Sequence, residues 1–545
     1  MNFLLNDETI ISEQDYSIRK KLYDKFSSLP QDFLSKMRHL QPQVGCFNNC
    51  SFCSKSSVCK SEFWNEKSLR NIISALKYSA MNYTKGDLLL AWDRKEHRIG
   101  VTFPYLNNDI AGYYYLDKYI ELCYKELGIR TRISTVGFSR HNKRLNEVHK
   151  KICNSDLLFA LAGVRLSITQ YGRVWEDEMS KTSLSEYEKD LSNFLSIYKP
   201  YYNIFGSGAR KMCVELRFSP LVVKEKVFDL NYNNHKVIIV NNYMFVSQEK
   251  NIILNESHII DPYMHSLKIS EDPKIFNEYS IDKKITTEDQ VIEFLDNNLK
   301  NLKPKRKCEL YLFKNRDGYY YAINPRIDDN GNYGINIYIK TEKRPNSGYL
   351  ITERFFLNAL CEFKKKKGLR FRDKYELSTW NDVEEVYNIC NKIAIDYKSE
   401  GKLDKFEYVV KHILPIIKVY KTALKEANYS SDCFFDSQFT IDTGTICNLG
   451  RAYNLFKDIT NYINEPLTPT HERNYGRFCS TMKQENYSWK LGCGYNDTLE
   501  IEKLELFNTA SDKGQVSFKE TIKIDNINNK IFEKSDKYLY PGVKK

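Results

Sequence analysis

Helices and strands are predicted to alternate along the first half of the chain. The first helix carries apolar residues at positions i, i+3, i+4 and i+7, namely Leu69, Ile72, Ile73 and Leu76. A second covers 116–127 and ends at Gly128, a residue typical of the position after a helix. A third covers 145–152, and a fourth opens with the capping box of Ser183 and Glu186 and is expected to end before Pro200.

Apolar and β-branched runs between these helices predict strands. They cover residues 40–44, 99–106, 130–136, 163–169 and 211–218, and a segment at 237–240 completes the series. Strands that alternate with helices predict a parallel sheet built from right-handed βαβ units, and hence an α/β fold. In such sheets the loops at the carboxyl ends of the strands carry the chemistry.

The pattern changes after about residue 250. A helix at 286–300 precedes an antiparallel meander of three strands, whose turns carry Asp-Gly and Asn-Gly pairs. A mainly helical region and a mixture of short strands with a helix follow. We therefore divide the chain into an N-terminal helical segment (1–38), a core (39–250), a linker helix with the meander (251–345), a helical region (346–428) and a mixed α+β C-terminal region (429–545).

Composition indicates a globular protein. Hydrophobic residues make up 42% of the 545 residues, yet no run approaches the ~18–20 apolar residues of a membrane-spanning helix. The acidic N-terminus does not have the pattern of a signal peptide, so we expect a cytoplasmic protein with no membrane partner. In that compartment the fourteen cysteines stay reduced, and clustered thiols are typical of metal ligands or catalysts.

The net charge of +12 is spread over most of the chain. Only the runs at 303–307 and 364–367 concentrate basic residues. We interpret them as solvated faces and a linker, because nucleic-acid-binding domains usually show a denser basic stripe. RNA binding stays open as an alternative.

Three cysteines lie close together in the segment QVGCFNNCSFCSKS. Cys46, Cys50 and Cys53 form a C-x3-C-x2-C array. Structural zinc and complete iron–sulfur clusters normally take four protein ligands, so three thiolates leave one metal corner open. The alternative is a closed zinc site with Cys59 or His39 as the fourth ligand, although no second C-x2-C pair follows at the usual distance.

This array has an aromatic residue, Phe52, before its last cysteine and lies on the first loop of a β/α repeat, and it resembles the radical S-adenosylmethionine superfamily. The resemblance covers roughly residues 39–250 and implies a partial (β/α)6 barrel, followed here by an α+β C-terminal extension. It implies that Cys46, Cys50 and Cys53 hold a 4Fe–4S cluster whose fourth iron chelates S-adenosylmethionine. An external reductant of the flavodoxin or ferredoxin type supplies one electron, and the resulting 5′-deoxyadenosyl radical abstracts hydrogen from a substrate.

The resemblance also suggests where the cofactor binds. The turn after the second strand usually reads Gly-Gly-Glu and holds the amino group; here it ends in Asn108 and Asp109, which are also ordinary helix-capping residues. Polar residues share one face of the fourth strand (Arg165, Ser167, Thr169) and of the fifth (Glu215, Arg217, Ser219). We expect Ser167 to contact the ribose or carboxylate, and Glu215 or Arg217 to contact cofactor or substrate. A structural Glu–Arg ion pair is the alternative.

The sequence identifies neither the residue that takes part in hydrogen transfer nor the substrate. A peptide or other natural product is our first expectation, RNA modification the alternative among enzymes, and a zinc-stabilised binding protein without catalysis the alternative from another class. The segment from Cys433 to Cys447 partly resembles the SPASM or twitch extensions that hold an auxiliary cluster, with Cys479 and Cys493 further on. The later cysteine run of those extensions is missing, so the auxiliary cluster stays open.

Overall fold

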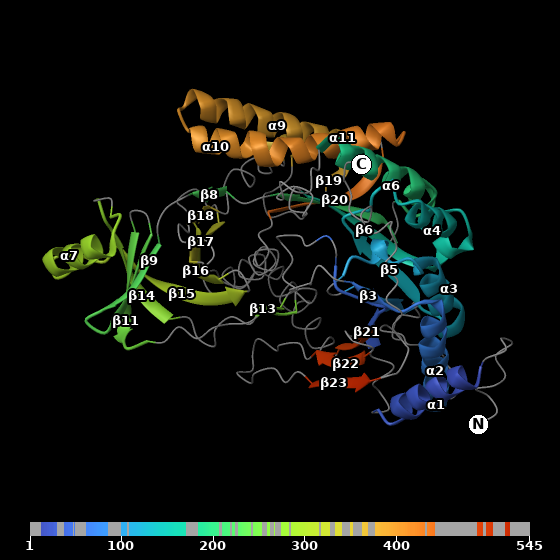
Figure 1. The fold of residues 1–545 in the computed structure, drawn as a ribbon. Coiled ribbons are helices and arrows are strands. Elements are labelled where there is room, and N and C mark those ends of the chain that lie inside the picture. Colours follow the sequence, from blue (N-terminus) through green and yellow to red (C-terminus); the bar gives the residue numbers. More distant parts are fainter. Residues whose placement is uncertain are drawn as a thin grey trace.

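The fold is that of a computed structural model (Figure 1). The structure describes residues 12–29, 37–46, 48, 61–84, 100–105, 108–169, 184–206, 210–218, 221–223, 227–240, 243–252, 259–261, 266–267, 274–282, 285–315, 318–327, 333–340, 349–351, 362–363, 365–368, 377–430, 433–441, 488–493, 498–504 and 518–523. None of the helices in these ranges is long and apolar enough to cross a membrane.

A run of parallel strands organises the first half of the chain. β4 (Val101–Thr102), β5 (Arg130–Thr135), β6 (Leu161–Thr169), β7 (Met212–Phe218) and β20 (Phe434–Ile441) pair in that order, each parallel to the next. One parallel bridge between His39 and Phe103 places β1 (Met37–Gln41) beside β4. The short β19 (Leu377–Thr379) pairs antiparallel with β20 at the other edge. The α/β class predicted from the sequence is confirmed.

Helices connect these strands and cover one face of the sheet (Figure 1). They are α2 (Glu66–Thr84), α3 (Leu116–Leu127), α4 (Lys143–Cys153) and α6 (Leu184–Phe205), with short 3-10 helices at η4 (Ile110–Gly112) and η5 (Asp156–Ala160). The N-terminal α1 (Glu13–Ser27) packs on α2, where Arg19 Nε donates to Asn71 Oδ1 at 2.8 Å and Lys67 pairs with Asp15.

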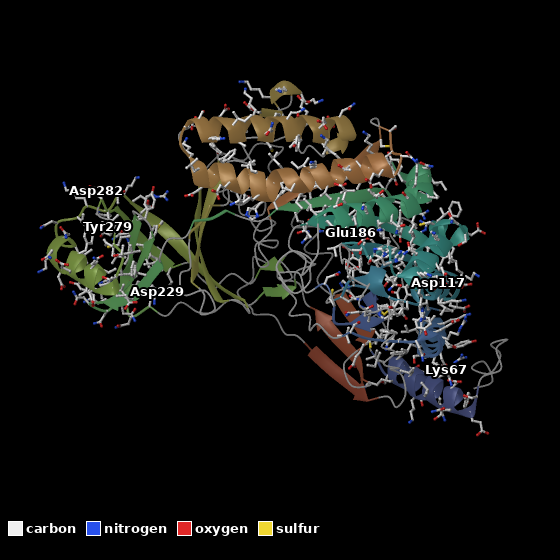
Figure 2. The ribbon with its side chains drawn as sticks, turned by 45° about the horizontal axis from the view of Figure 1, so that its top comes forward. Lys67, Asp117, Glu186, Asp229, Tyr279 and Asp282 are labelled. Carbon is white, nitrogen blue, oxygen red and sulfur yellow. The ribbon has the colours of Figure 1, made fainter. Side chains whose placement is uncertain are left out.

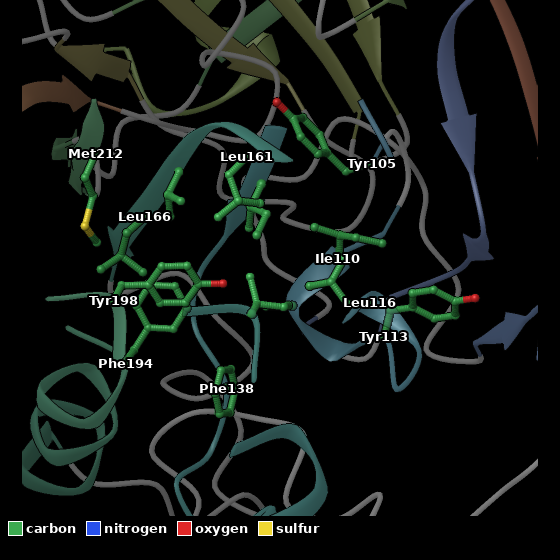
Figure 3. Close-up of a cluster of buried hydrophobic side chains, with 14 of the residues drawn as sticks. Tyr105, Ile110, Tyr113, Leu116, Phe138, Leu161, Leu166, Phe194, Tyr198 and Met212 are labelled. Carbon is green, nitrogen blue, oxygen red and sulfur yellow. The ribbon is translucent and has the colours of Figure 1, made fainter. Parts of the chain in front are cut away.

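The two faces of the sheet differ in polarity. On β6, Val164, Leu166 and Ile168 are fully buried in the main apolar core, and Val214 and Leu216 on β7 join them. Figure 3 shows Leu166 beside Phe194 and Tyr198 of α6, whose rings stack at 4.5 Å, whereas Tyr105 points away from that cluster. The opposite face carries the polar residues of the same strands. Burial of apolar area on the helix side, at about 25 cal/mol per Å2, holds helices and sheet together.

Two sequence predictions are wrong here. Helix α6 does not end before Pro200 but continues to Phe205. Proline removes one helical hydrogen bond, and burial of Tyr198 and Tyr201 on either side offsets that loss. The segment 237–240 does not continue the parallel series, since it lies in β10 (His235–Val240), which pairs antiparallel with both neighbours.

A nine-stranded antiparallel sheet follows β7. Its order is β8 (Leu221–Val223), β18 (Tyr349–Ile351), β17 (Tyr333–Lys340), β16 (Gly318–Ile327), β15 (Arg306–Asn315), β14 (Lys274–Ser280), β11 (Tyr243–Lys250), β10 and β9 (Val227–Tyr232). The predicted meander is confirmed as β15, β16 and β17, and the predicted helix as α7 (Glu288–Asn298). Tyr279 and Asp229 lie in this sheet, apart from Asp117 and Lys67 of the helical side (Figure 2). The hairpin of β12 (Ile259–Asp261) and β13 (Ser266–Leu267) forms a separate small sheet.

Helices return the chain to the parallel sheet. α9 (Trp380–Ser399) and α10 (Leu403–Tyr408) lead through a π-helical turn (Val409–Ile413) into α11 (Leu414–Glu426). Pro415 follows that turn and lacks the N–H that a regular helix would use, which explains the local widening. α11 packs beside α6 and β7 and leads into β20, so residues between β7 and α9 form an insertion into one parallel crossover.

The C-terminal strands extend the other edge of the sheet. β21 (Ser488–Cys493) pairs parallel with β1, and β22 (Thr498–Leu504) and β23 (Phe518–Lys523) add antiparallel strands. Strand β1 therefore lies between β21 on one side and β4 on the other.

Candidate functional site

The cysteine loop is closed by a short ribbon. β2 (Gln43–Val44) pairs antiparallel with β3 (Glu62–Phe63), so Gly45 and Ser61, which follow and precede these strands, lie near each other after the carboxyl end of β1. Gly45 has a φ of 83°, a left-handed conformation that glycine adopts without strain and that turns the chain out of β2. The loop thus begins where the sequence predicts it, at the edge of the sheet that carries chemistry in α/β folds.

Of the three predicted metal ligands, only Cys46 belongs to the described residues, and its side chain is partly exposed. Cys50 and Cys53 lie outside the described residues, as does Cys59, the alternative fourth ligand. His39 is buried on β1, with its ring 5.7 Å from that of Phe103. Within the described ranges, no three His, Cys, Asp or Glu side chains are arranged to hold a metal ion.

Asp109 lies at the centre of a hydrogen-bond network. Its Oδ2 accepts from the side-chain amide of Asn48 at 2.9 Å and from the Val136 N–H at 2.9 Å. Its Oδ1 accepts from the Ala111 N–H at 3.0 Å, which caps the 3-10 helix η4, and the Thr135 hydroxyl also donates to the carboxylate. A carboxylate offers about four acceptor positions, and four protein donors use them.

The surroundings of Asp109 also affect its charge. Burial of the carboxyl group raises its pKa to about 6, although the hydrogen bonds from Val136, Thr135, Ala111 and Asn48 act in the opposite direction. The neighbouring Asn108 donates its side-chain amide to the Pro104 carbonyl at 3.2 Å. Both residues therefore lie at the carboxyl end of β4, close to the cysteine loop.

The polar face of β6 and β7 converges on Glu215. Its Oε2 accepts from Arg165 Nε at 2.9 Å and from Arg217 Nη2 at 2.8 Å, and Ser167 Oγ is 3.2 Å away. Glu215, Ser167 and Arg217 are all buried. The register, which pairs Ser167 with Glu215 and Thr169 with Arg217, puts these side chains on one face as predicted. Ser219, the last predicted member, lies outside the described residues.

Charge pairing keeps this cluster ionised. Burial alone would lower the pKa of Arg165, but Glu215 opposes this and raises it above its usual range. Tyr105, three residues after β4, also raises the pKa of Arg165 through its electrostatic interaction with the guanidinium group. The cluster holds two guanidinium groups around one carboxylate, an arrangement suited to an anionic group of a ligand.

Sequence reasoning missed two contributors to this region. Strand β20 pairs with β7 so that Gln438 is next to Glu215 and Thr440 next to Arg217. The alternation of polar and bulky residues in FFDSQFTI is the signal that indicates such a strand, although nothing local indicates its partner. The second contributor is His149 of α4, whose imidazole contacts the Ala111 carbonyl in the loop after β4. Cys433 and Cys493 are the described members of the possible auxiliary site. Cys493 lies in β21, next to β1, whereas Cys433 directly precedes β20, next to β7. The strands β1, β4, β5, β6 and β7 therefore separate the two cysteines.

Comparison with known proteins finds no family model, no curated protein and no solved structure that matches this chain.

Proposed function

We propose that this protein is a radical S-adenosylmethionine enzyme. The observation that supports it most is the position of the C-x3-C-x2-C loop, which starts at the carboxyl end of β1, beside the parallel strands β4 to β7, of which β6 and β7 carry buried polar side chains. On this proposal β1, β4, β5, β6, β7 and β20 are the six strands of a partial (β/α)6 barrel. This face holds two guanidinium groups around one carboxylate, which would suit a polar cofactor that carries an anionic group.

Cys46, Cys50 and Cys53 would hold a 4Fe–4S cluster through their thiolates. When bound, cluster and S-adenosylmethionine together supply a 5′-deoxyadenosyl radical that abstracts hydrogen from the substrate. Cys46, the described member of this set, is a partly exposed cysteine and so suits the role of a thiolate ligand. An external flavodoxin or ferredoxin would deliver the electron, and the substrate would be a peptide or small natural product.

The polar face would bind the rest of the cofactor. Arg217, held by Glu215, would pair with the cofactor carboxylate or an anionic group of the substrate, and Ser167 would contact the ribose or carboxylate. For the amino group, the hydrogen bonds favour Asn108 over Asp109, whose acceptor positions are used by protein donors. The side chain of Asn108 carries an amide oxygen, an acceptor of the kind that pairs with an ammonium group.

Metal content tests this proposal without any knowledge of the substrate. The protein is purified without oxygen, reconstituted with iron and sulfide, and analysed for metal. We expect about four irons per chain for one cluster of this type, and about eight if an auxiliary cluster is also present. We also expect the electron paramagnetic resonance spectrum of the reduced cluster to change when S-adenosylmethionine is added. Zinc without iron would overturn the proposal and favour a zinc-stabilised binding protein.

Two variants sharpen the assignment. Cys46→Ala is expected to abolish both the iron–sulfur absorption and cleavage of S-adenosylmethionine, because each thiolate fills one iron corner. Cys59→Ala is the matched control, since it removes a nearby thiol from the same loop and is expected to retain both. Loss of metal in Cys59→Ala as complete as in Cys46→Ala would indicate a four-cysteine structural site instead.

A further inference from the structure

The carboxyl ends of three neighbouring strands are joined by one side chain. β1, β4 and β5 are parallel neighbours, so the loops that follow them start at the same edge of the sheet. Asp109 lies in the middle loop and its Oδ2 bonds to both others: to Asn48 of the cysteine loop and to the backbone of Val136 after β5. Asn48 is two residues from Cys46 and two from Cys50, and it is buried.

The loop that carries Asp109 is itself fixed to the helical layer through His149 on α4. His149 Nε2 lies 2.9 Å from the Ala111 carbonyl oxygen, and Nδ1 lies 2.8 Å from the Tyr198 hydroxyl. A carbonyl only accepts, so Nε2 carries the proton and Nδ1 accepts from Tyr198. The imidazole is fully buried, and both of its nitrogens are used in this way.

The same imidazole supports the third loop. Phe138 stacks on His149 with ring centroids 4.5 Å apart, and Figure 3 shows Phe138 beside Phe194 and Tyr198. Phe138 follows Val136 by two residues, in a turn where Gly137 has a φ of 94° and its N–H bonds to Thr135 Oγ1. His149 thus holds the loops after β4 and β5, and Asp109 joins them to the cysteine loop.

We propose that Asp109 is a positioning residue, supported by His149, that holds Asn48, and with it the start of the cysteine loop at Cys46, against the loops that follow β4 and β5. This inference rests on the proposed function for the identity of the metal, but the hydrogen-bonded connection itself does not depend on it. It differs from the expectation from the sequence, in which Asp109 binds the cofactor directly. This positioning role requires a hydrogen-bond acceptor at position 109 and a donor at position 48. Substitutions that remove either group therefore test it.

The first test uses the metal-free protein. Iodoacetamide modification of Cys46 is followed by peptide mass spectrometry in the parent, Asn48→Ala and Asp109→Asn. Asn48→Ala removes the donor, and Asp109→Asn places an amide N–H against the donors of Asn48 or Val136. We expect Cys46 to react about 10-fold faster in both variants, the change that loss of a hydrogen bond to a charged group produces in a local opening equilibrium. Unchanged rates in both would overturn the proposal.

Asn142→Ala is the matched control. Asn142 caps α4 by accepting from the Leu145 N–H at 2.9 Å, in the loop after β5, and it belongs to the same helix as His149. Asn142→Ala is expected to lower the stability of the fold, as loss of a typical cap does. If Asn142→Ala accelerated Cys46 modification as much as Asn48→Ala, the effect would reflect general destabilisation and the proposal would fail.

The second test uses the reconstituted protein and a spectroscopic readout. We expect Asn48→Ala to bind iron but to lose it to a chelator about 10-fold faster than the parent. Its reduced cluster is expected to give an altered electron paramagnetic resonance spectrum. Asn142→Ala is expected to resemble the parent in both measurements. Identical resonance and iron retention in Asn48→Ala and the parent would overturn the positioning role. If the parent binds zinc instead of iron, the proposed function fails, whereas faster Cys46 modification in the metal-free variants would still support the connection.

Discussion

A single oxygen of Glu215 accepts hydrogen bonds from Arg165, Ser167 and Arg217, from two different strands. Removing one charge from a buried pair leaves its partners uncompensated, which costs about 3–5 kcal/mol. Glu215→Gln keeps the size of the side chain but removes the charge shared by two guanidinium groups. We expect it to lower the free energy of unfolding of the metal-free protein by an amount in that range, measured by urea denaturation at neutral pH.

Ser167→Ala is the companion variant, because it removes one uncharged donor to the same oxygen and is expected to cost about 1.5 kcal/mol, the lower end for a hydrogen bond to a charged group. Calorimetric titration with S-adenosylmethionine then separates a structural from a functional ion pair. A Glu215→Gln protein as stable as Ser167→Ala would contradict the structural role, and unchanged cofactor binding in a folded variant would contradict the functional one.

Residue patterns predicted the polar face but not its connections. Period-two alternation was enough to place Arg165 and Ser167 together, because strand geometry fixes which side chains share a face. The bond between Asn48 and Asp109 joins residues 61 positions apart, and no local pattern indicates it. The assignment of Asp109 from the sequence left cap and cofactor ligand open, and only the three-dimensional contacts show how many donors surround its carboxylate.

At the scale of the element, α4 contains a buried base that makes stability depend on pH. Burial lowers the pKa of His149 from 6.5 to about 4, so between these values the unfolded chain binds more protons than the folded one. Stability from His149 is therefore complete above pH 6.5 and is lost as the pH falls towards 4, by at most ~3 kcal/mol.

His149→Gln tests this, since glutamine can donate to the Ala111 carbonyl and accept from Tyr198 without titrating. We expect the parent's stability advantage over His149→Gln to shrink from pH 7 to pH 4.5 in urea denaturation of the metal-free protein. The raised pKa of Asp109 acts with the opposite sign, because the folded state then binds the extra proton, but this contribution is common to both proteins and cancels in the comparison. A pH-independent difference would contradict the prediction.

Elements with strong local signals were predicted well. Helix α3 spans the expected residues and ends at Gly128, whose φ of 65° is the left-handed conformation that glycine favours. The prediction that α6 ends before Pro200 was wrong, because it considered only the hydrogen bond that proline removes. It did not consider the buried tyrosines on either side of the proline. Strand β4 is shorter than expected, at Val101–Thr102, within the predicted range 99–106.

At the scale of the whole molecule, the basic runs bear on the RNA alternative. Lys366 lies 3.7 Å from Glu385, and Lys367 lies 3.2 Å from Asp382, so part of the run at 364–367 is paired with acidic residues of α9. Lys303 and Lys305 are exposed. We expect weak binding to single-stranded RNA that is the same in Lys303→Glu/Lys305→Glu and in the parent, measured by fluorescence anisotropy. A log affinity that falls steeply with log salt, by about 0.7 per phosphate neutralised, would favour RNA modification.

The strand order of the parallel sheet leads to the last prediction. The sequence placed the core at residues 39–250, yet β7 pairs with β20 at 434–441, and α11 packs on α6 and β7. A fragment of residues 12–250 would expose the β7 edge and the apolar surfaces that α11 covers, and unpaired edges of this kind promote aggregation. Chain-local patterns could not reveal this, because the two strands are separated by an insertion that contains a sheet of its own.

We therefore expect the 12–250 fragment to be largely insoluble or to lack a cooperative thermal transition. Co-expression with a second fragment of residues 377–441 is expected to recover soluble protein with cooperative unfolding, followed by circular dichroism, because it restores both β20 and α11. The matched control is a second fragment of residues 377–430, which supplies α11 but not β20 and is expected to recover less. A cooperative transition in the 12–250 fragment alone would show that the first half of the chain folds independently of β20.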